Sequence, residues 1–389
     1  MSNATQTMDA PTSTGRSVIS NARIGLGVIG LLAGLAAAAG LLTGGHATFN
    51  TTSNLSWGLP VSAYVFFVLT STGLTFVASL AMVFGMKNFY PIAKRCVWGA
   101  IATLVIGFIS LGLEIGHPLR MIWAVPLNLQ VRSPMFWMGL FYTAYGVFLI
   151  WKFMLINKGD WDSSTSRKVG IASLLTVVFA HATLGSVFGM MAMRPFWYGG
   201  MVPVYFLITA FLSGLAFIML FINLDYGVDH GNMSDGARKA MSEQLPIIFT
   251  IVLGLVIVFT IAKTITGLWT NVNEVQIVTR HIVSSFWFQF ELWIGMVLPF
   301  LLMLSAKRSD PRMQTLAGGL VIVALFIGRY EYVVGGQLVP LFKGAWYDDL
   351  IAYTPSMTEI GVVVLAVSVG LLLYGYGDKK LKLSDAPKI

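Results

Sequence analysis

Long apolar stretches alternate with short polar linkers along almost the whole chain. Each stretch approaches the roughly 20 residues that an α-helix needs to cross the hydrocarbon core of a bilayer. The period-two alternation of a membrane β-barrel is absent, so helices are the expected spanning elements. The pattern predicts an all-α integral membrane protein with about ten transmembrane helices. We place these near residues 24–44, 61–86, 96–114, 134–156, 169–193, 203–225, 245–270, 287–306, 313–335 and 357–377.

The composition excludes a soluble globular protein. Hydrophobic residues make up 56% of the chain and charged residues 11%, whereas a soluble domain has roughly 25% charged residues. The single cysteine, Cys96, cannot form an internal disulfide. One thiolate also cannot hold a zinc or iron–sulfur site alone. We therefore expect no metal site in this chain, and we expect any such centre to belong to a partner.

Membrane topology explains the net charge of +8 better than nucleic-acid binding does. Of the 25 Lys and Arg residues, 18 lie at the termini or in linkers on the same side of the membrane. The positive-inside rule then places both termini of this multi-pass protein in the cytoplasm. The first 20 residues are polar and lack the features of a signal peptide, so we expect the first helix to be retained.

Two apolar stretches resemble each other at a constant offset of 141 residues. The equivalent pairs are Trp57 and Tyr198, Tyr64 and Tyr205, and Gly73 and Gly214. Helices four apart run in the same direction, so the pattern indicates two four-helix bundles repeated in parallel, plus two extra helices. Chance similarity among apolar helices is the alternative. The expected units are a polar amino-terminal segment (1–22), a first bundle (23–160), a second bundle (161–310), two additional helices (311–377) and a basic cytoplasmic tail (378–389).

Ionisable side chains within the apolar stretches gather in the half of the membrane away from the termini. A charge there is costly and usually marks a functional site. Glu114, His117 and Arg120 end the third stretch, before a long loop that contains Trp123. A carboxylate, an imidazole and a guanidinium at the membrane surface would bind a polar head group and exchange its protons. The alternative is an interfacial salt bridge that anchors the loop.

Later stretches carry five more ionisable residues, Lys263, Glu291, Arg329, Glu331 and Glu359. We expect Lys263, Glu291 and Arg329 to face the bundle interior and to partner one another. They form either a charge network that fixes helix packing or a proton-conducting half-channel. His181, near the middle of the fifth stretch, is either a packing residue or a ligand. The half of the membrane nearer the termini is expected to hold almost none of this chemistry.

Three motifs resemble, in their order, the membrane subunits of the NrfD/PsrC (polysulfide reductase) family. They are Trp57-Gly58-Leu59-Pro60-x3-Tyr64, then Glu114-x2-His117-Pro118-x-Arg120 with Ser133-Pro134-Met135-x-Trp137, and then Arg194-Pro195-x-Trp197 with Ser213-Gly214. The resemblance covers about residues 50–306. The ten-helix length and the Gly-His-Pro-Leu-Arg-x-x-Trp loop look most like the family's DsrP branch, which belongs to the DsrMKJOP complex of sulfur metabolism.

The resemblance implies a membrane-anchoring subunit of a respiratory or sulfur-metabolism complex that reacts with menaquinone or ubiquinone and itself binds neither haem nor an iron–sulfur cluster. Electrons would pass between quinone and a ferredoxin-like iron–sulfur subunit on the periplasmic face, with cytochrome c and other membrane subunits as further partners. Glu114 and His117 would exchange protons. The expected quinone-binding residues are Tyr64, Arg120, Trp123, Tyr142 and His181, and Arg194 and Trp197 form the outer motif of the second bundle.

Functions of other classes stay open at this point. A proton-coupled secondary transporter also uses repeats and buried charges, although its repeats are often inverted and its site lies near the midplane. A haem b quinol dehydrogenase would need axial His or Met ligands, and no two His residues form an obvious pair in the middle of the membrane. A purely structural anchor is the third alternative.

Overall fold

The computed structural model describes residues 13–116, 120, 123, 127–341 and 350–387. These residues form helices and no β-strand, and ten of the helices are long and apolar enough to cross a membrane. The predicted all-α membrane fold is thereby confirmed. Most spanning helices carry proline in their first turn, where a missing N–H leaves no helical hydrogen bond unmade.

The spanning helices are α1 (Ser13–Gly44), α2 (Leu59–Met82), α3 (Tyr90–Glu114), α5 (Pro134–Asn157), α6 (Ser164–Gly189), α7 (Val202–Asp225), α9 (Leu245–Trp269), α12 (Leu298–Leu304) with the segments before it, α13 (Pro311–Gly335) and α14 (Met357–Lys380). The span of α12 begins with α11 (Phe286–Gln289) and a π-helical segment (Phe290–Val297). The short helix α8 (Asp235–Lys239) leads through a second π-helical segment (Ala240–Gln244) into α9, and α10 (Asn273–Ser284) follows α9.

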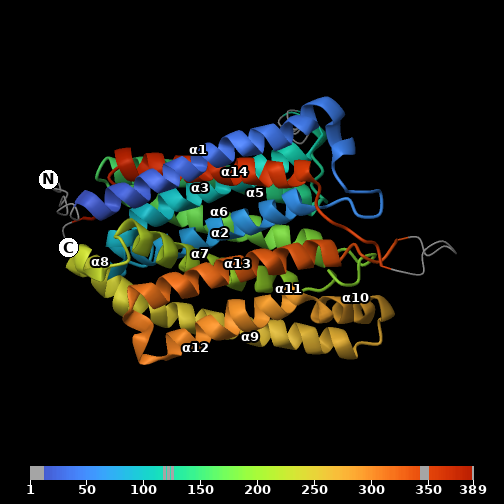
Figure 1. Ribbon diagram of the computed structural model, residues 1–389. Coiled ribbons are helices and arrows are strands. Elements are labelled where there is room, and N and C mark those ends of the chain that lie inside the picture. The colour runs from blue at the N-terminus through green and yellow to red at the C-terminus, as the bar shows by residue number, and fades with distance from the viewer. Residues whose placement is uncertain (1–12, 117–119, 121–122, 124–126, 342–349, 388–389) are drawn as a thin grey trace.

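The start of α1 and the end of α14 lie at the same end of the molecule (Figure 1). We call this the terminal end. The opposite end carries α10, the short 3-10 helix Gly45–Thr48 and the loop after α6, and we call it the loop end. An even number of spans puts both ends of the chain on one side, as the topology prediction requires. Which side faces the cytoplasm stays a prediction.

Helices α2 and α7 cross at the centre of the molecule, and α2 is buried along nearly its whole length. Their backbones touch at two glycines. A Cβ atom on Gly73 would lie 1.8 Å from the carbonyl oxygen of Ala210, and one on Gly214 would lie 2.1 Å from the carbonyl carbon of Gly73. Beside the crossing, the hydroxyl groups of Thr70 and Ser213 hydrogen-bond at 2.6 Å. This close pair lies between the two sets of candidate site residues.

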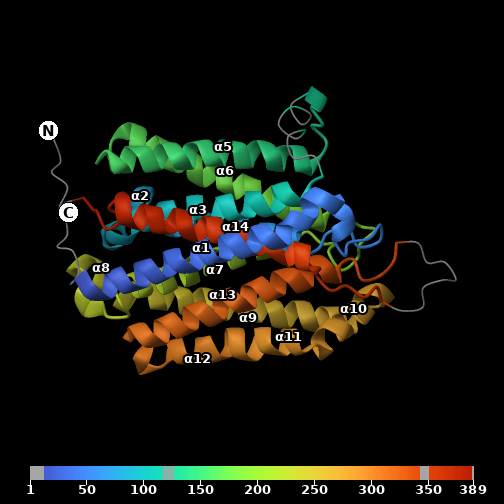
Figure 2. The same ribbon diagram turned by 45° about the horizontal axis from the view of Figure 1, so that its top comes forward.

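The other helices pack on either side of the α2–α7 pair. Helices α2, α3, α5 and α6 pack together, and we call these four the first helix group. Helices α7, α9, α12 and α13 pack together and form the second helix group. Figure 2 shows the α5–α6 pair on one flank and α9 and α12 on the other. Helix α1 lies along α14, and α14 lies along α3. The division of the chain into two four-helix bundles (23–160 and 161–310) and two additional helices (311–377) stays a prediction.

Buried charges near the terminal end contradict the expectation that this half holds almost none. Asp225 accepts hydrogen bonds from Arg23, from Arg95 and, at 2.9 Å, from the Tyr374 hydroxyl. Arg95 also pairs with Asp378 at 3.2 Å. The expectation was wrong because α3 and α14 extend past their apolar stretches. Charges that the sequence assigns to linkers are therefore packed between helices, where each finds an opposite charge.

Candidate functional site

Two buried tyrosines lie behind an exposed phenylalanine in the first helix group. Tyr64 on α2 and Tyr142 on α5 both contact the ring of Phe108 on α3, with ring centroids 6.1 Å and 5.9 Å away. The Tyr64 hydroxyl also lies 3.8 Å from the sulfur of Met138. Phe108 is 40% exposed on the outside of the bundle. Its ring therefore separates the two phenol groups from the surrounding lipid.

His181 joins this cluster from α6 and is fully buried. Its Nδ1 atom lies 3.0 Å from the Thr72 hydroxyl and 3.4 Å from the Tyr142 hydroxyl. Its Nε2 atom has no hydrogen-bond partner among the described residues. In the tautomer in which Tyr142 donates to Nδ1, the proton sits on Nε2 and is free to be donated. In the other tautomer Nδ1–H donates to Thr72, whose own hydroxyl donates to the Val68 carbonyl, and Nε2 is an acceptor. In either tautomer Nε2 is placed to bind a group that is not part of the chain.

Glu114 ends α3 toward the loop end, six residues after Phe108 and so about 9 Å along the helix axis. Its backbone carbonyl accepts a hydrogen bond from Nε2 of His46. Its carboxyl atom Oε2 is buried without a partner among the described residues. A carboxyl oxygen left unpaired at this depth is available to take or release a proton.

The loop after Glu114 contributes less than expected to this cluster. Arg120 and Trp123 are both exposed, Trp123 by 56%, whereas the tyrosines and His181 are buried. His117 lies outside the described residues. The predicted roles of these three residues in quinone binding and proton exchange stay predictions.

Arg194 and Trp197, the outer motif of the second bundle, hold the loop end together. The Trp197 indole stacks on Trp57, with ring centroids 5.3 Å apart and the planes 22° from parallel. Arg194 donates to the backbone carbonyls of Asn54 and Val339, both at 2.8 Å. Partial burial lowers the pKa of the Arg194 guanidinium from its usual value. These contacts tie two loops that are far apart in sequence to the segment that enters α2.

Two polar side chains fix the start of α2: Gln337, which sequence reasoning missed, and Glu359, which it placed only among the ionisable residues of the later stretches. The Gln337 amide accepts from the backbone N–H of Trp57 at 3.0 Å and donates to the Trp57 carbonyl at 2.8 Å. The buried Glu359 carboxylate accepts from the Tyr353 hydroxyl, which itself accepts from the Leu59 N–H at 2.8 Å. Burial beside this carboxylate raises the pKa of Tyr353. A lone Gln just past the end of an apolar stretch is the only signal for such a role.

A second cluster of ionisable groups lies in the other helix group. The Glu291 and Glu331 carboxyl groups hydrogen-bond to each other, and the Ser285 hydroxyl donates to Glu331 at 2.9 Å. Two carboxyl groups within hydrogen-bonding reach can share a proton between them. Glu291 also lies on the π-helical segment Phe290–Val297, an irregularity that is frequent at functional sites.

Lys263 and Arg329 contact aromatic rings in place of the direct pairing expected with Glu291. The Lys263 ammonium lies 4.3 Å from the centre of the Tyr332 ring. Arg329, 4% exposed, lies 4.4 Å from the Phe206 ring centre and donates to the Thr209 hydroxyl. Ion pairs of Lys263 or Arg329 with Glu291 are absent among the described residues. Cation–π contacts compensate these charges instead.

A cavity of about 60 Å³ lies between these groups and is lined by Tyr205, Lys263, Glu291 and Glu331, among others. A buried water molecule needs a cavity volume of about 10–15 Å³, so this cavity has room for several water molecules. Its walls offer a cation, carboxyl groups and a phenol as hydrogen-bond partners. In the part of the chain that the structure describes, no three His, Cys, Asp or Glu residues gather as a candidate metal site.

Comparison with known proteins places these features in a group of membrane subunits. The family model described as "Polysulphide reductase, NrfD" matches residues 47–340. A selenate reductase subunit of Mesobacillus selenatarsenatis is 27% identical, over 85% of this chain and 88% of the relative. A putative dimethyl sulfoxide reductase membrane subunit of Halobacterium salinarum is 25% identical, over 97% and 96%. An Hdr-like menaquinol oxidoreductase integral membrane subunit of Archaeoglobus fulgidus is 23% identical, over 85% and 86%.

Proposed function

Since the chain belongs to the NrfD family of polysulphide reductase membrane subunits, we propose that it is the quinone-reactive subunit of an electron-transfer complex. One relative is named as a menaquinol oxidoreductase subunit and another as the membrane subunit of a reductase. In this proposal menaquinone or ubiquinone is the substrate. A ferredoxin-like iron–sulfur subunit exchanges its electrons, and this chain binds neither haem nor an iron–sulfur cluster.

The arrangement of Tyr142 and His181 carries the proposal. A quinone ring presents two carbonyl oxygens on an otherwise apolar disc, so its pocket needs a few donors among apolar walls. The proposal takes the tautomer in which Tyr142 donates to Nδ1 of His181, so that Nε2–H is one donor. The Tyr64 hydroxyl, whose described partner is a weakly accepting sulfur, is the second. A quinone would enter from the bilayer by displacing the ring of Phe108.

Protons accompany the electrons in this reaction. Reduction of a quinone to quinol takes two electrons and two protons, and oxidation of the quinol releases the same number. We assign the proton exchange to Glu114, whose Oε2 atom is buried without a partner among the described residues, and to His117. Arg120 and Trp123 would guide the head group at the entrance of the pocket.

The Glu291–Glu331 pair has a second role in the same proposal. Both carboxyl groups line a cavity that can hold water, and in the proposal Lys263 and Arg329 stabilise negative charge there. We propose that these four residues form a proton path from the loop end. Structural anchoring of the helices is the competing role, and replacement of Glu291 by glutamine separates the two.

The loop end is the proposed docking face for the iron–sulfur subunit, and we take it to be periplasmic. Large side chains are exposed there, including Met193 by 75%, Tyr198 by 61% and Met357 by 80%. Both termini would then be cytoplasmic in a bacterial inner membrane. Cytochrome c and further membrane subunits belong to the proposed complex, and membership of the DsrP branch is proposed on the Gly-His-Pro-Leu-Arg-x-x-Trp loop and the ten-helix length.

The test is quinol-linked electron transfer by the intact complex. We expect His181→Ala and Tyr142→Phe to lower the rate roughly tenfold or more, the effect of losing one buried hydrogen bond. Tyr145→Phe is the matched control, because this buried tyrosine of the same helix bonds Ser71 and Thr75 instead. Wild-type rates in both variants would overturn the assignment. Solute uptake without quinone turnover would favour a transporter. A reducible Soret band in the absorption spectrum of the purified protein would favour a haem protein.

A further inference from the structure

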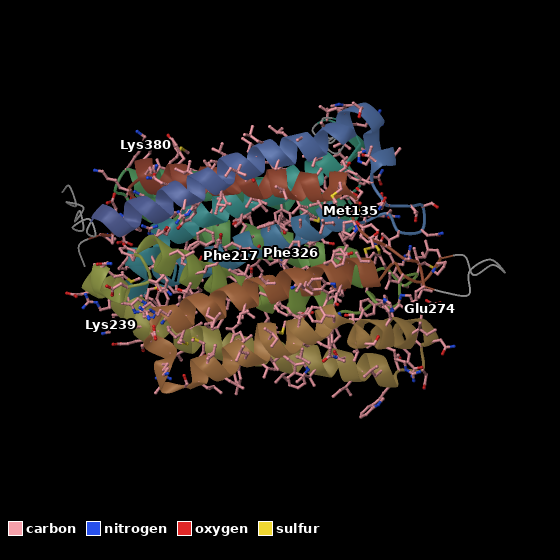
Figure 3. All side chains as sticks on the ribbon, in the orientation of Figure 1. Met135, Phe217, Lys239, Glu274, Phe326 and Lys380 are labelled. Carbon is pink, nitrogen blue, oxygen red and sulfur yellow. The ribbon has the colours of Figure 1, made fainter. Side chains whose placement is uncertain are left out.

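An apolar crevice of about 430 Å³ lies between the two helix groups, apart from the sites described above. Its lining comes from α2, α3, α7, α13 and α14. Figure 3 shows two of the lining residues, Phe217 on α7 and Phe326 on α13, in the space between α13 and α14. Both are partly exposed, and Val323 on α13 is 47% exposed. The crevice therefore opens between α13 and α14 toward the surrounding bilayer.

A crevice of this kind is filled in a membrane. Its walls are almost wholly hydrocarbon, so water finds no hydrogen-bond partners inside it. If it stayed empty, the aromatic and aliphatic side chains that line it would lose van der Waals contacts on one side. Hydrocarbon chains of the bilayer are the nearest groups that supply those contacts.

The end of the crevice nearer the terminal end is rich in cationic groups. Arg95 and Tyr374 line it there, and the Arg23 guanidinium lies 5.0 Å from the centre of the Tyr374 ring. Asp225 and Asp378 compensate these two arginines. Even so, Nη1 of Arg23 and Nε of Arg95 are buried without a hydrogen-bond partner among the described residues.

Two exposed lysines, Lys379 and Lys380, add positive charge in the last turn of α14. Lys379 donates to the Asn21 amide oxygen at 3.0 Å, and neither lysine forms an ion pair among the described residues. Figure 3 shows Lys380 at the terminal end, above the level of Phe217 and Phe326. The crevice thus combines an apolar channel with a basic rim at the depth of the membrane surface. A neutral isoprenoid tail or a zwitterionic lipid matches only the channel.

We propose that this crevice binds one acyl chain of an anionic phospholipid from the leaflet at the terminal end. The phosphate group lies beside Lys379 and Lys380, with Arg23 behind it. The lipid fills the space between α13 and α14 and thereby joins the two helix groups. This site is independent of the proposed quinone reaction.

The experiment uses the intact complex purified in mild detergent, with phosphatidylglycerol as the probe and phosphatidylcholine of the same acyl chains as the reference. Native mass spectrometry counts the lipids retained by this subunit, and thermal unfolding follows added lipid. We expect one phosphatidylglycerol to be retained, and we expect it to raise the melting temperature more than phosphatidylcholine does.

Two variants test the two halves of the site. Val323→Trp narrows the opening and is expected to abolish retention, whereas Val258→Trp, at a residue 63% exposed on α9 and outside the crevice lining, is expected to leave it unchanged. Lys379→Gln with Lys380→Gln is expected to reduce the preference for phosphatidylglycerol roughly tenfold. Lys239→Gln with Lys307→Gln, which removes two exposed charges outside the crevice lining, is the control.

Equal retention of phosphatidylglycerol by Val323→Trp and Val258→Trp would overturn the proposal. Retention of a quinone in place of phospholipid would also overturn it. So would a complex that binds phospholipid only after a partner subunit is removed, because a helix of that partner would then fill the crevice. An unchanged lipid preference after loss of Lys379 and Lys380 would overturn the assignment of the phosphate position.

Discussion

Gly73 and Gly214 touch backbone to backbone where α2 and α7 cross. They are 141 residues apart, the offset at which these two helices resemble each other in sequence. When two repeats are related by a twofold axis, equivalent positions meet each other at that axis. Parallel repeats about an axis along the membrane normal are known in membrane proteins. Such a repeat would bring these two glycines together at its axis, and the repeat itself stays a prediction.

This crossing leaves no room for a side chain at either glycine. We expect Gly73→Ala and Gly214→Ala each to destabilise the protein by about 1–3 kcal/mol, because the added methyl group meets backbone atoms that cannot move aside. The control is Gly319→Ala in α13, where an added Cβ meets no atom within 4 Å. There alanine is expected to be neutral or stabilising. Thermal unfolding in detergent measures all three, and equal melting temperatures would show that the helices cross less closely.

The charge cluster at the terminal end depends on one carboxylate. Asp225→Asn removes the negative charge shared by Arg23 and Arg95, which leaves buried guanidinium groups short of a partner. Breaking a buried pair in this way costs about 3–5 kcal/mol. Asp235→Asn is the control, since the Asp235 side chain is fully exposed and its pair with Arg238 spans 3.8 Å. The two variants should differ clearly in denaturation midpoint, and similar midpoints would contradict a stabilising role for Asp225.

Glu114→Gln tests proton exchange at the proposed quinone site. The amide cannot take up a proton, so we expect kcat for quinol-linked turnover to fall by roughly a hundredfold while the KM for quinone changes little. Glu243→Gln, at an exposed position near the terminal end, should leave both constants unchanged. A raised KM with a normal kcat would instead show that Glu114 binds the head group without moving its proton.

Glu291→Gln separates the two roles of the second cluster. Glutamine keeps a hydrogen bond to Glu331, so we expect the melting temperature to change little. It cannot release the shared proton, so proton movement coupled to turnover in sealed vesicles should be lost. Glu291→Ala, which removes the hydrogen bond as well, should lower both. If Glu291→Gln leaves coupled proton movement intact, the cluster serves helix packing alone.

The helices could be predicted from sequence because lipid imposes one simple requirement, a long apolar stretch with its backbone hydrogen bonds satisfied internally. The stretch expected at 61–86 is the helix Leu59–Met82, and that expected at 287–306 is the span Phe286–Leu304. Two helices start well before their apolar stretches: α1 starts at Ser13 rather than 24, and α3 starts at Tyr90 rather than 96. The first turns of α3 contain Lys94 and Arg95, whose ion pairs form only in the folded protein.

The candidate site could be predicted only in part, for a related reason. Tyr64, Tyr142 and His181 stand out as polar groups within apolar stretches, and they do lie together. The contacts of Gln337 with Trp57 and of Tyr353 with Leu59 join positions 280 and 294 residues apart, which no local pattern reveals. The amphipathic helix α10 (Asn273–Ser284) was also missed, because it is too polar to read as a span.

Direct binding of quinone to the purified complex tests the central claim most directly. Titration with a menaquinone analogue, followed by quenching of tryptophan fluorescence, gives Kd for the wild type, His181→Ala and the control Tyr145→Phe. The proposed site predicts one saturable site per chain, a Kd raised roughly tenfold by His181→Ala, and no change in the control. Saturable binding that is equally tight in His181→Ala would contradict a quinone site at Tyr142 and His181.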